Sequence, residues 1–291
     1  MSHIPQKLED IRVGQRFCFK DQCATIRYIG AVKSTEGTWL GVEWDDGATR
    51  GKHSGNKDGV QYFECNKSGT PGSFIRYTPK LDFGQSFTQA LEEAYLKIDS
   101  DTWDLYGLPT TIGDTKAKVE AVGFEKYIRD QRSTSNLPMV ALDKMKISSL
   151  GDDLASKKQI LKVISGIKEL NLSRNLLSTW DEIHNIISKL PNLESIDISF
   201  NCFEINETIK YPQFLKLKTL KLNGAYQSWP QILAIISMMP NLEQLEMAFN
   251  KLTDLNIPNN IEVPLNLQLI SLENNSIHDP KTIVNLFSHF K

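Results

Sequence analysis

Residues 242–250 read Leu-Glu-Gln-Leu-Glu-Met-Ala-Phe-Asn (LEQLEMAFN), one copy of the pattern LxxLxLxxN in a chain of 291 residues. Further copies stand at 167–175 (IKELNLSRN), 193–201 (LESIDISFN) and 267–275 (LQLISLENN), with a variant at 217–225 (LKTLKLNGA) and a degenerate first copy from Leu137. The copies end at positions 175, 201, 225, 250 and 275, which lie 24–26 residues apart. Such self-similarity predicts stacked units that share one continuous core.

This period and pattern are those of a leucine-rich repeat. We therefore predict an α/β leucine-rich-repeat solenoid of about six repeats over residues 137–291. In each unit the apolar positions point inward, and the asparagine side chain bonds backbone groups in the turn that leaves the strand. Ala225 cannot make these bonds, so a local irregularity is expected there.

Apolar residues at i, i+3, i+4 and i+7 predict three amphipathic outer helices. The stripes are Ile183–Leu190, Ile232–Met239 and Ile283–Phe290, which places one helix in every second unit. The intervening segments contain proline and are expected to be irregular. The apolar stripes are interpreted as core packing.

The solvent-facing centre of the predicted strands forms a mixed polar column, which suits a protein partner better than nucleic acid. We predict a partner-binding face there, and for any single residue an ordinary solvated surface is an equally good interpretation. Its residues are Asn171, Asp197, Lys221, Glu246 and Ser271.

The first 81 residues are rich in glycine and contain short alternating segments, which predict a small all-β SH3-like barrel. The expected strands are Arg16–Lys20, Ala24–Ile29, Trp39–Trp44, Tyr62–Cys65 and Ser73–Arg76. Residues 82–136 are predicted to be a partly helical connector, with helices near 87–95 and 116–132 around a loop at 100–115. The fold class is thus multidomain, with the barrel followed by the solenoid.

Composition narrows the function. Residues 1–81 carry 12 Lys+Arg and 9 Asp+Glu, a net +3 that is too weak to indicate nucleic acid. No apolar run is long enough to span a membrane, and the N-terminus does not resemble a secretory signal. The four cysteines are therefore expected to be reduced. We find no nucleotide, nucleophile or metal motif, so we expect no enzyme, no cofactor and no metal.

The stretch GKHSG at 51–55 lies between GTWLGVE (37–43) and, downstream, YFEC (62–65) and GSFIR (72–76). In order and spacing these segments resemble a CAP-Gly domain, a family that binds acidic C-terminal tails ending in Glu-Glu-Tyr or Glu-Glu-Phe. The resemblance implies a peptide site in which Lys52 pairs with the terminal carboxylate. The glycines would let backbone N–H groups approach that carboxylate closely, aromatic side chains would hold the last ring, and an arginine would face the glutamates. The implied site residues are Trp39, Gly51, Lys52, His53, Gly55, Phe74 and Arg76.

Two departures from the family pattern affect this site. His53 and Ser54 stand where the family has Asn-Asp, which changes the hydrogen bonds available to the tail. Ser34 stands five residues before Trp39, where the family usually has phenylalanine, so one wall of the groove is expected to be thinner. His53 could also make binding sensitive to pH.

A CAP-Gly domain followed by leucine-rich repeats resembles the tubulin-binding cofactor E family of tubulin-folding chaperones, as does the segment at 122–152. That resemblance implies two-point capture of α-tubulin, its tail in the barrel and its body on the repeats, together with other tubulin-folding cofactors. It implies a cytoplasmic, cytoskeleton-associated monomer that binds neither nucleic acid nor membranes. The family also has a C-terminal ubiquitin-like domain, so we expect either truncation before it or a last helix that serves as the cap.

Two other binding functions are compatible with these residues. The first is a microtubule-associated adaptor that uses the same groove for C-terminal EEY/F-type motifs and the repeats for cargo. The second is a Tudor-like or SH3-like reader of nucleic acid or methyl-lysine, which the GKHSG loop and the lack of a clustered aromatic cage disfavour.

Overall fold

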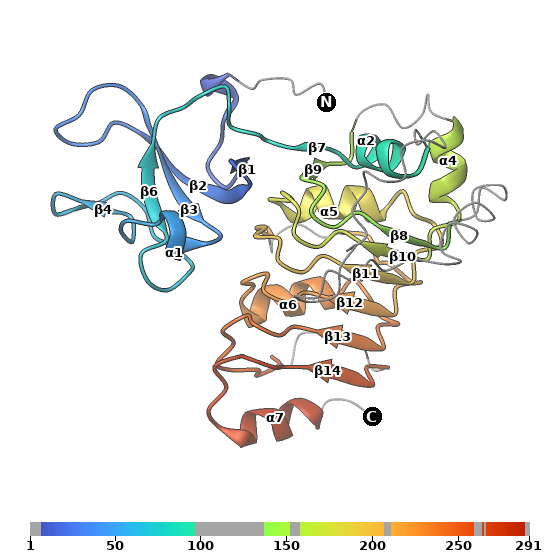
Figure 1. Ribbon diagram of the computed structural model, residues 1–291. Helices are drawn as coiled ribbons and strands as arrows, with labels where there is room; N and C mark the ends of the chain where they lie inside the picture. Colours follow the sequence, from blue (N-terminus) through green and yellow to red (C-terminus); the bar gives the residue numbers. More distant parts are fainter. Residues whose placement is uncertain are drawn as a thin grey trace, which may run out of the picture.

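The two largest sheets in the described part of the chain differ in construction, since one is antiparallel and the other is parallel (Figure 1). The structure is a computed structural model that describes residues 7–96, 137–151, 158–206, 211–258, 264 and 266–288. The helix expected near 116–132 and the loop at 100–115 lie outside these residues. We refer to residues 7–84 as the N-terminal region and to the described residues from 137 onward as the repeat region.

The N-terminal region is an antiparallel sheet whose strand order is β1-β2-β3-β6. Its strands are β1 (Arg16–Phe19), β2 (Gln22–Gly30), β3 (Trp39–Trp44) and β6 (Gly72–Ile75), with η1 (Leu8–Asp10), α1 (Gly47–Arg50) and the hairpin β4 (Asn56–Lys57) and β5 (Val60–Gln61) beside them. Alternation places Leu40, Val42 and Trp44 of β3 inward, where they pack against Phe17 and Ile26. Four of the five predicted strands are therefore present.

The structure corrects two expectations in this region. Tyr62–Cys65 is not a strand, because the amides of Tyr62 and Phe63 both donate to the carbonyl of Gly55 rather than to a neighbouring strand. Cys18 and Cys23 form a disulfide, although reduced cysteines were expected. The two residues face each other across the β1–β2 hairpin, which the spacing alone did not indicate. Cys65 and Cys202 are free.

The segment that follows the N-terminal region packs directly against the repeat region. Strand β7 (Gln85–Ser86) pairs in parallel with β9 (Ile147–Ser149). Helix α2 (Phe87–Leu91) continues into a π-helical turn, η2 (Glu92–Leu96). Phe87, Ala90 and Leu91 are buried in the same apolar cluster as the repeats. The predicted helix near 87–95 is confirmed, and it covers one end of the repeat core.

The repeat region is a parallel sheet in which each copy of the sequence pattern gives one strand. The strands are β8 (Met139–Ala141), β10 (Glu169–Asn171), β11 (Ser195–Asp197), β12 (Thr219–Lys221), β13 (Gln244–Glu246) and β14 (Leu269–Ser271). They pair in register from β8 to β14. From β8 to β13 the middle residue of each strand is buried, which leaves the residues on either side facing outward.

Buried asparagines connect successive strands, as the pattern predicts. Asn175 donates through Nδ2 to the carbonyls of Leu142 (2.8 Å) and Leu172 (2.9 Å), and its Oδ1 accepts from the amide of Ile147. Asn250 and Asn275 make the equivalent bonds in later units. At the position of Ala225 the strands stay in register, and the Gln227 side chain donates to the carbonyls of Phe203 and Ala225 instead.

The three predicted outer helices are present as α5 (Trp180–Ile187), α6 (Trp229–Ile236) and α7 (Pro280–Phe287). A fourth, α4 (Lys158–Ile164), was not expected and buries Ile160, Val163 and Ile164. Helices α4 and α5 therefore occupy consecutive units, so the expected alternation is wrong at that end. None of the helices in the described residues is long and apolar enough to cross a membrane.

Candidate functional site

An aromatic layer covers the outer face of β3 and β6, opposite the core of the N-terminal region. Phe74 lies at its centre, with its ring centroid 5.0 Å from His53, 5.3 Å from Tyr62, 5.6 Å from Phe63 and 6.4 Å from Tyr28. Most of these rings meet edge to face, the arrangement that their quadrupoles favour. A half-buried cluster of this kind offers an apolar wall to a ligand.

A β-bulge brings Tyr28 into this layer. Strand alternation from Ile26 would turn Tyr28 toward the core, but the pairing of β2 with β3 shifts between these two residues. Tyr28 therefore pairs with Gly41 on the outer face. A Cβ atom at Gly41 would lie 2.5 Å from the Phe63 ring, so only glycine lets the layer close over β3. Sequence reasoning missed Tyr28 because alternation carries no signal for a bulge.

The glycines of the GKHSG loop have an internal role. A Cβ at Gly51 would lie 1.8 Å from the carbonyl oxygen of Thr70, and one at Gly55 (φ +100°) would lie 1.8 Å from that of Phe63. The amides of Gly51, Lys52 and His53 donate to backbone carbonyls within the N-terminal region, and that of Gly55 donates to Nδ1 of His53. The amides of Gly51 and Gly55 are thus already hydrogen-bonded inside the domain, and the approach of backbone N–H groups of this loop to a carboxylate stays a prediction.

Lys52 and His53 carry the chemistry of this loop. The Lys52 side chain is exposed, which leaves a compact cation at the edge of the aromatic layer. The His53 ring is half-buried between Phe63 and Phe74. Burial lowers the pKa of His53, and the positive charges of Lys52 and Lys57 lower it further. Because Nδ1 accepts a hydrogen bond from Gly55, the neutral ring carries its proton on Nε2.

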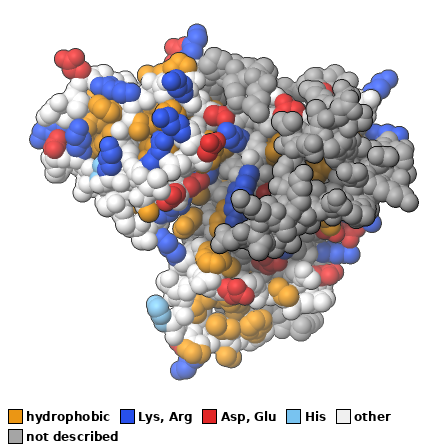
Figure 2. Space-filling view, in the orientation of Figure 1, with side chains coloured by type: hydrophobic (Ala, Val, Ile, Leu, Met, Phe, Trp, Pro, Cys, Tyr) orange, Lys and Arg blue, Asp and Glu red, His pale blue; other side chains and the backbone are white. Residues whose placement is uncertain are grey.

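Trp39 and Arg76 form a unit beside this layer. The guanidinium of Arg76 stacks 3.9 Å from the Trp39 ring and donates to the carbonyls of Thr38 (2.9 Å) and Glu36. Lys57 also lies over the Trp39 ring, at 5.8 Å. Arg76 was predicted to bind the ligand, but some of its N–H groups donate to the loop before β3 instead. The Trp39 ring and the nearby cations stay at the surface. Figure 2 shows Lys and Arg side chains gathered over the N-terminal region.

The predicted partner-binding residues of the repeat region form one row across the parallel sheet. Register places them side by side, in the order Asn171, Asp197, Lys221, Glu246 and Ser271. The charges in this row are largely paired: Lys221 Nζ lies 2.8 Å from Glu246 Oε1, and Asn223 also donates to Glu246. The hydrogen bond to Glu246 raises the pKa of Lys221. The row is therefore a polar surface that is close to neutral.

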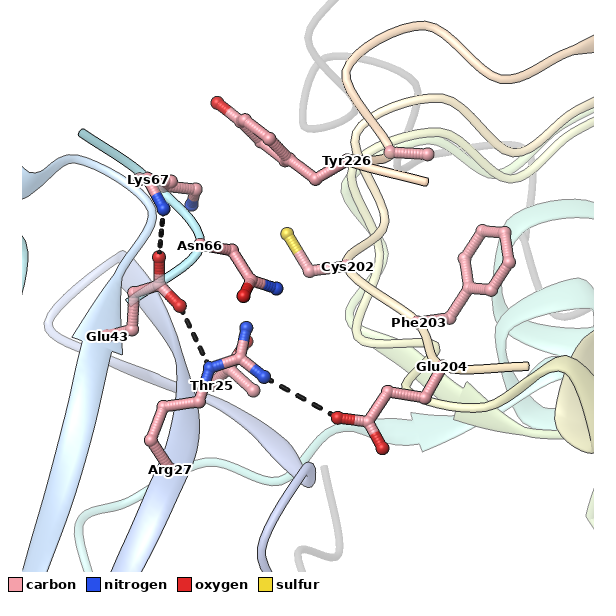
Figure 3. Close-up of a pocket in the computed structure, with 10 residues that line it drawn as sticks. Thr25, Arg27, Glu43, Asn66, Lys67, Cys202, Phe203, Glu204 and Tyr226 are labelled. Carbon is pink, nitrogen blue, oxygen red and sulfur yellow. Dashed lines mark hydrogen bonds and ion pairs between the residues drawn. The ribbon is translucent and has the colours of Figure 1, made fainter. Parts of the chain in front are cut away.

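The two regions meet through an ion-pair network that the sequence did not predict (Figure 3). Arg27, the extra residue of the bulge, donates from Nε to Glu43 Oε2 at 2.8 Å and lies 3.5 Å from Glu204 Oε1 in the repeat region. The Glu43 side chain is only 2% exposed, and its other oxygen accepts from the backbone amide of Lys67. Such pairing satisfies a charge that would be costly to bury alone.

A second set of contacts joins the regions through one aromatic ring. Lys67 lies 5.5 Å from the centroid of the Tyr226 ring, and Lys251 lies 5.4 Å from it. Lys251 also donates to the carbonyl of Asn66. Lys67 also forms an ion pair with Asp45, and Asp45 in turn forms an ion pair with the buried guanidinium of Arg16 at 2.6 Å. Burial alone would raise the pKa of Asp45, but the charge and hydrogen bond of Arg16, assisted by Lys67, hold it below its usual value.

The family model for the CAP-Gly domain matches residues 13–79, the segment that contains the antiparallel sheet, the glycine loop and the aromatic layer. Residues 13–79 are a CAP-Gly domain. The rest of the chain, with its parallel sheet, lies outside that match. Among the described residues, no group of three or more His, Cys, Asp or Glu side chains could hold a metal ion.

Relatives extend the similarity beyond the CAP-Gly domain. The chain is 36% identical over 213 residues to tubulin-specific chaperone E of Mus musculus and 38% identical over 212 residues to that of Xenopus laevis, in each case 72% of this chain. The protein of the same name from Drosophila melanogaster is 32% identical over 215 residues. The alignments cover 38–39% of these relatives' own length, so the chain spans about two fifths of the relatives that it matches.

Proposed function

We propose that this chain is a non-enzymatic tubulin-folding cofactor that grips α-tubulin at two places. The CAP-Gly domain would hold the acidic C-terminal tail, and residues 137–291, interpreted as a leucine-rich-repeat solenoid, would hold the folded body. The similarity to tubulin-specific chaperone E, together with the CAP-Gly match, supports tubulin as the partner. This grip would serve the assembly or dissociation of the tubulin heterodimer, as a monomer and together with other tubulin-folding cofactors in the cytoplasm.

The observation that carries this proposal is the exposed Lys52 beside the aromatic layer around Phe74. A peptide that ends in glutamates and an aromatic residue offers a free carboxylate, a ring and further negative charge. Lys52 would pair with the terminal carboxylate, while the ring would rest on Phe74 and His53. Lys57, which lies over Trp39, would face the glutamates with Arg76.

Two-point capture also has a physical advantage that depends on the junction. The ion pairs of Arg27 and the contacts of Tyr226 join the CAP-Gly domain to the repeat region. A partner held at one place is then presented to the other at a raised effective concentration, so that two weak contacts suffice. In Figure 1 the hairpin of β4 and β5 lies on the side of the CAP-Gly domain that faces away from the parallel sheet. A flexible tail could reach this side while the body stays on the repeats.

The experiment that tests this function is a titration of the chain with a peptide that ends in Glu-Glu-Tyr. Amidation of the peptide, removal of its last tyrosine and the substitution Lys52→Ala are each expected to weaken binding at least about tenfold, the usual scale for truncating an anchor. Lys80→Ala removes another exposed lysine outside the aromatic layer and serves as the matched control. Indifference to amidation would refute carboxylate capture by this loop.

A second titration separates this function from that of a microtubule-associated adaptor. A folding cofactor is expected to bind the free tubulin heterodimer, whereas an adaptor is expected to bind assembled microtubules in preference. Binding to microtubules alone would support the adaptor function, which uses the same groove.

A further inference from the structure

Beyond the ends of the strands of the parallel sheet, one residue in each unit has a left-handed backbone conformation, and these residues form a row. In each unit the residue just before the asparagine position adopts φ between +53° and +61°. The amides of the first five members donate to carbonyls of the next unit, which stacks them one above another. This left-handed row consists of Lys144, Arg174, Phe200, Gly224, Phe249 and Asn274.

The backbone of the row does not require aromatic residues. Left-handed φ favours glycine and asparagine, the residues that occupy it at Gly224 and Asn274. A bulky side chain in this conformation is an outlier that calls for another explanation. Phe200 and Phe249 nevertheless occupy two of the six positions, and their side chains are 36% and 48% exposed. The rings are therefore present for a reason other than the turn.

The ring of Phe200 is held at the surface by its neighbours. It lies against Gly224, where a Cβ atom would come within 2.6 Å of the ring, and the guanidinium of Arg174 covers it at 4.5 Å. Arg174 and Lys144 add positive charge at the start of the row. The row is thus an apolar stripe with a cationic end, unlike the nearly neutral polar row on the strands.

The position of the left-handed row connects the two surfaces already described. Two residues after Gly224 and Phe249 come Tyr226 and Lys251, which contact the CAP-Gly domain. On the other side, each residue of the row comes three residues after the last residue of a strand of the parallel sheet. A partner that lies on the parallel sheet and reaches the CAP-Gly domain must therefore cross it.

We infer that the left-handed row is a docking edge for the folded body of the protein whose acidic tail the CAP-Gly domain takes. This inference rests on the proposed function. The surface that fits is an apolar patch with acidic residues beside it: the patch would cover Phe200 and Phe249, and the carboxylates would meet Arg174 and Lys144. The nearly neutral strand row would add polar contacts around this centre.

The test uses the chain as it exists and tubulin heterodimers from which the C-terminal tails have been removed by limited proteolysis. Phe249→Asn removes the ring and puts in its place the residue that the last unit carries at Asn274, so the fold is expected to be kept. We expect this variant to bind tail-less tubulin about tenfold more weakly than the unaltered chain, the usual scale for losing one anchor. Its affinity for the tail peptide is expected to stay within twofold.

Two further variants keep the test decisive. Arg174→Glu reverses the charge at the cationic end and is expected to weaken binding of tail-less tubulin at least as much. Leu215→Asn removes a residue of the repeat region that is 61% exposed but lies outside the row, and it should leave binding unchanged. Thermal unfolding of each variant checks that the fold is intact.

The outcomes distinguish the docking edge from the proposed function. Unchanged binding of tail-less tubulin by both row variants would overturn the docking edge. So would an unaltered chain that binds intact but not tail-less tubulin, although tail capture would then stand. Failure of the unaltered chain to bind tubulin in any form would overturn both the proposed function and the docking edge.

Discussion

On the outer face of β3 and β6, four rings surround Phe74 and the Lys52 ammonium group is exposed. On the outer face of the parallel sheet, the central charges are paired with one another, as Lys221 is with Glu246. The first surface keeps cations and rings available to a ligand, whereas the second uses its polar groups to hold its own strands together. A change on the first should therefore affect binding, and a change within the second should affect stability.

The two regions also hold their backbones in different ways. The CAP-Gly loop relies on glycine, since any Cβ at Gly51 or Gly55 would strike a carbonyl oxygen. The repeat region relies on buried asparagine side chains, each of which bonds carbonyls from two successive units. Consequently the loop depends on the absence of side-chain atoms, and the repeats depend on the presence of one amide.

The buried side chains of Asn175, Asn250 and Asn275 form an asparagine ladder that connects successive units. We expect the largest loss of stability from a substitution in this ladder. Asn175→Ala would leave the carbonyl of Leu142 and the amide of Ile147 without their partner in a buried setting, whereas the carbonyl of Leu172 would keep the hydrogen bond from Asn201. Each buried group left without a hydrogen bond costs about 1–3 kcal/mol, so we expect a loss of about 2 kcal/mol or more in the free energy of unfolding. Chemical denaturation followed by circular dichroism measures it.

Asn192→Ala is the matched control for this prediction. The Asn192 side chain donates to the carbonyl of Ser165 and accepts from Nζ of Lys216, and both hydrogen bonds are exposed to solvent, so their loss should cost less than about 1 kcal/mol. Equal destabilisation by the two substitutions would contradict the ladder as the source of stability. Peptide binding by the CAP-Gly domain should survive both changes if the two regions are as different as their construction indicates.

An intermediate loss of stability is expected at the junction, the set of contacts that joins the CAP-Gly domain to the repeat region. Tyr226→Ala removes the ring that contacts both Lys67 and Lys251, and contacts of this kind contribute about 0.5–1 kcal/mol each. We expect a loss of about 1–2 kcal/mol in the free energy that holds the regions together. Small-angle scattering should then show a broader distribution of distances within the chain.

Tyr226→Phe keeps the ring and removes only the hydroxyl group, and it should behave as the unaltered chain does. A scattering profile that Tyr226→Ala leaves unchanged would show that the ion pairs of Arg27 hold the junction without the ring. If Tyr226→Phe loosened the chain as much as Tyr226→Ala, the hydroxyl rather than the ring would be the important group.

The sequence predicted what repeats and what alternates. The strands of the repeats, their inward apolar positions and the strand at β3 follow from periodicity, because each is set by local spacing. Tyr28 could not be placed in the same way, since the bulge at Arg27 reverses the alternation. The junction was also out of reach, because Glu204 and Tyr226 meet the CAP-Gly domain through tertiary contacts between residues far apart in the chain.

The site itself was predicted in part. Lys52, His53 and Phe74 come together as the motif indicates, but the amides of Gly51 and Gly55 are used inside the domain. A motif specifies which residues stand in a loop and leaves open which of their backbone groups are already bonded. The disulfide between Cys18 and Cys23 depends likewise on a hairpin that brings the two side chains opposite each other, which sequence spacing alone did not indicate.

The smallest effect should come from protonation of His53. A lower pH is expected to reduce the stability of the fold and to increase the affinity for an acidic peptide. The pKa of His53 in the fold lies below the value of 6.5 that an unfolded chain has, first through burial and then through Lys52 and Lys57. As the pH falls below 6.5 the unfolded chain takes up the proton first, so the contribution of His53 to stability is present above pH 6.5 and is lost as the pH falls through the folded value. An acidic peptide beside the ring would favour the proton and should bind more tightly at lower pH.

Because the His53 ring is only half-buried, this gain should stay near the value of an exposed ion pair, about twofold to fivefold in affinity between pH 7.5 and 6.0. Calorimetric titration with the peptide at both pH values, alongside thermal unfolding in the same buffers, measures the two signs in one set of samples. His53→Asn keeps a polar side chain that does not titrate, and it should remove both dependences. If the affinity of the unaltered chain rises with pH instead, or if the variant keeps the same pH profile, then the aromatic layer takes its ligand without any contribution from the charge of His53.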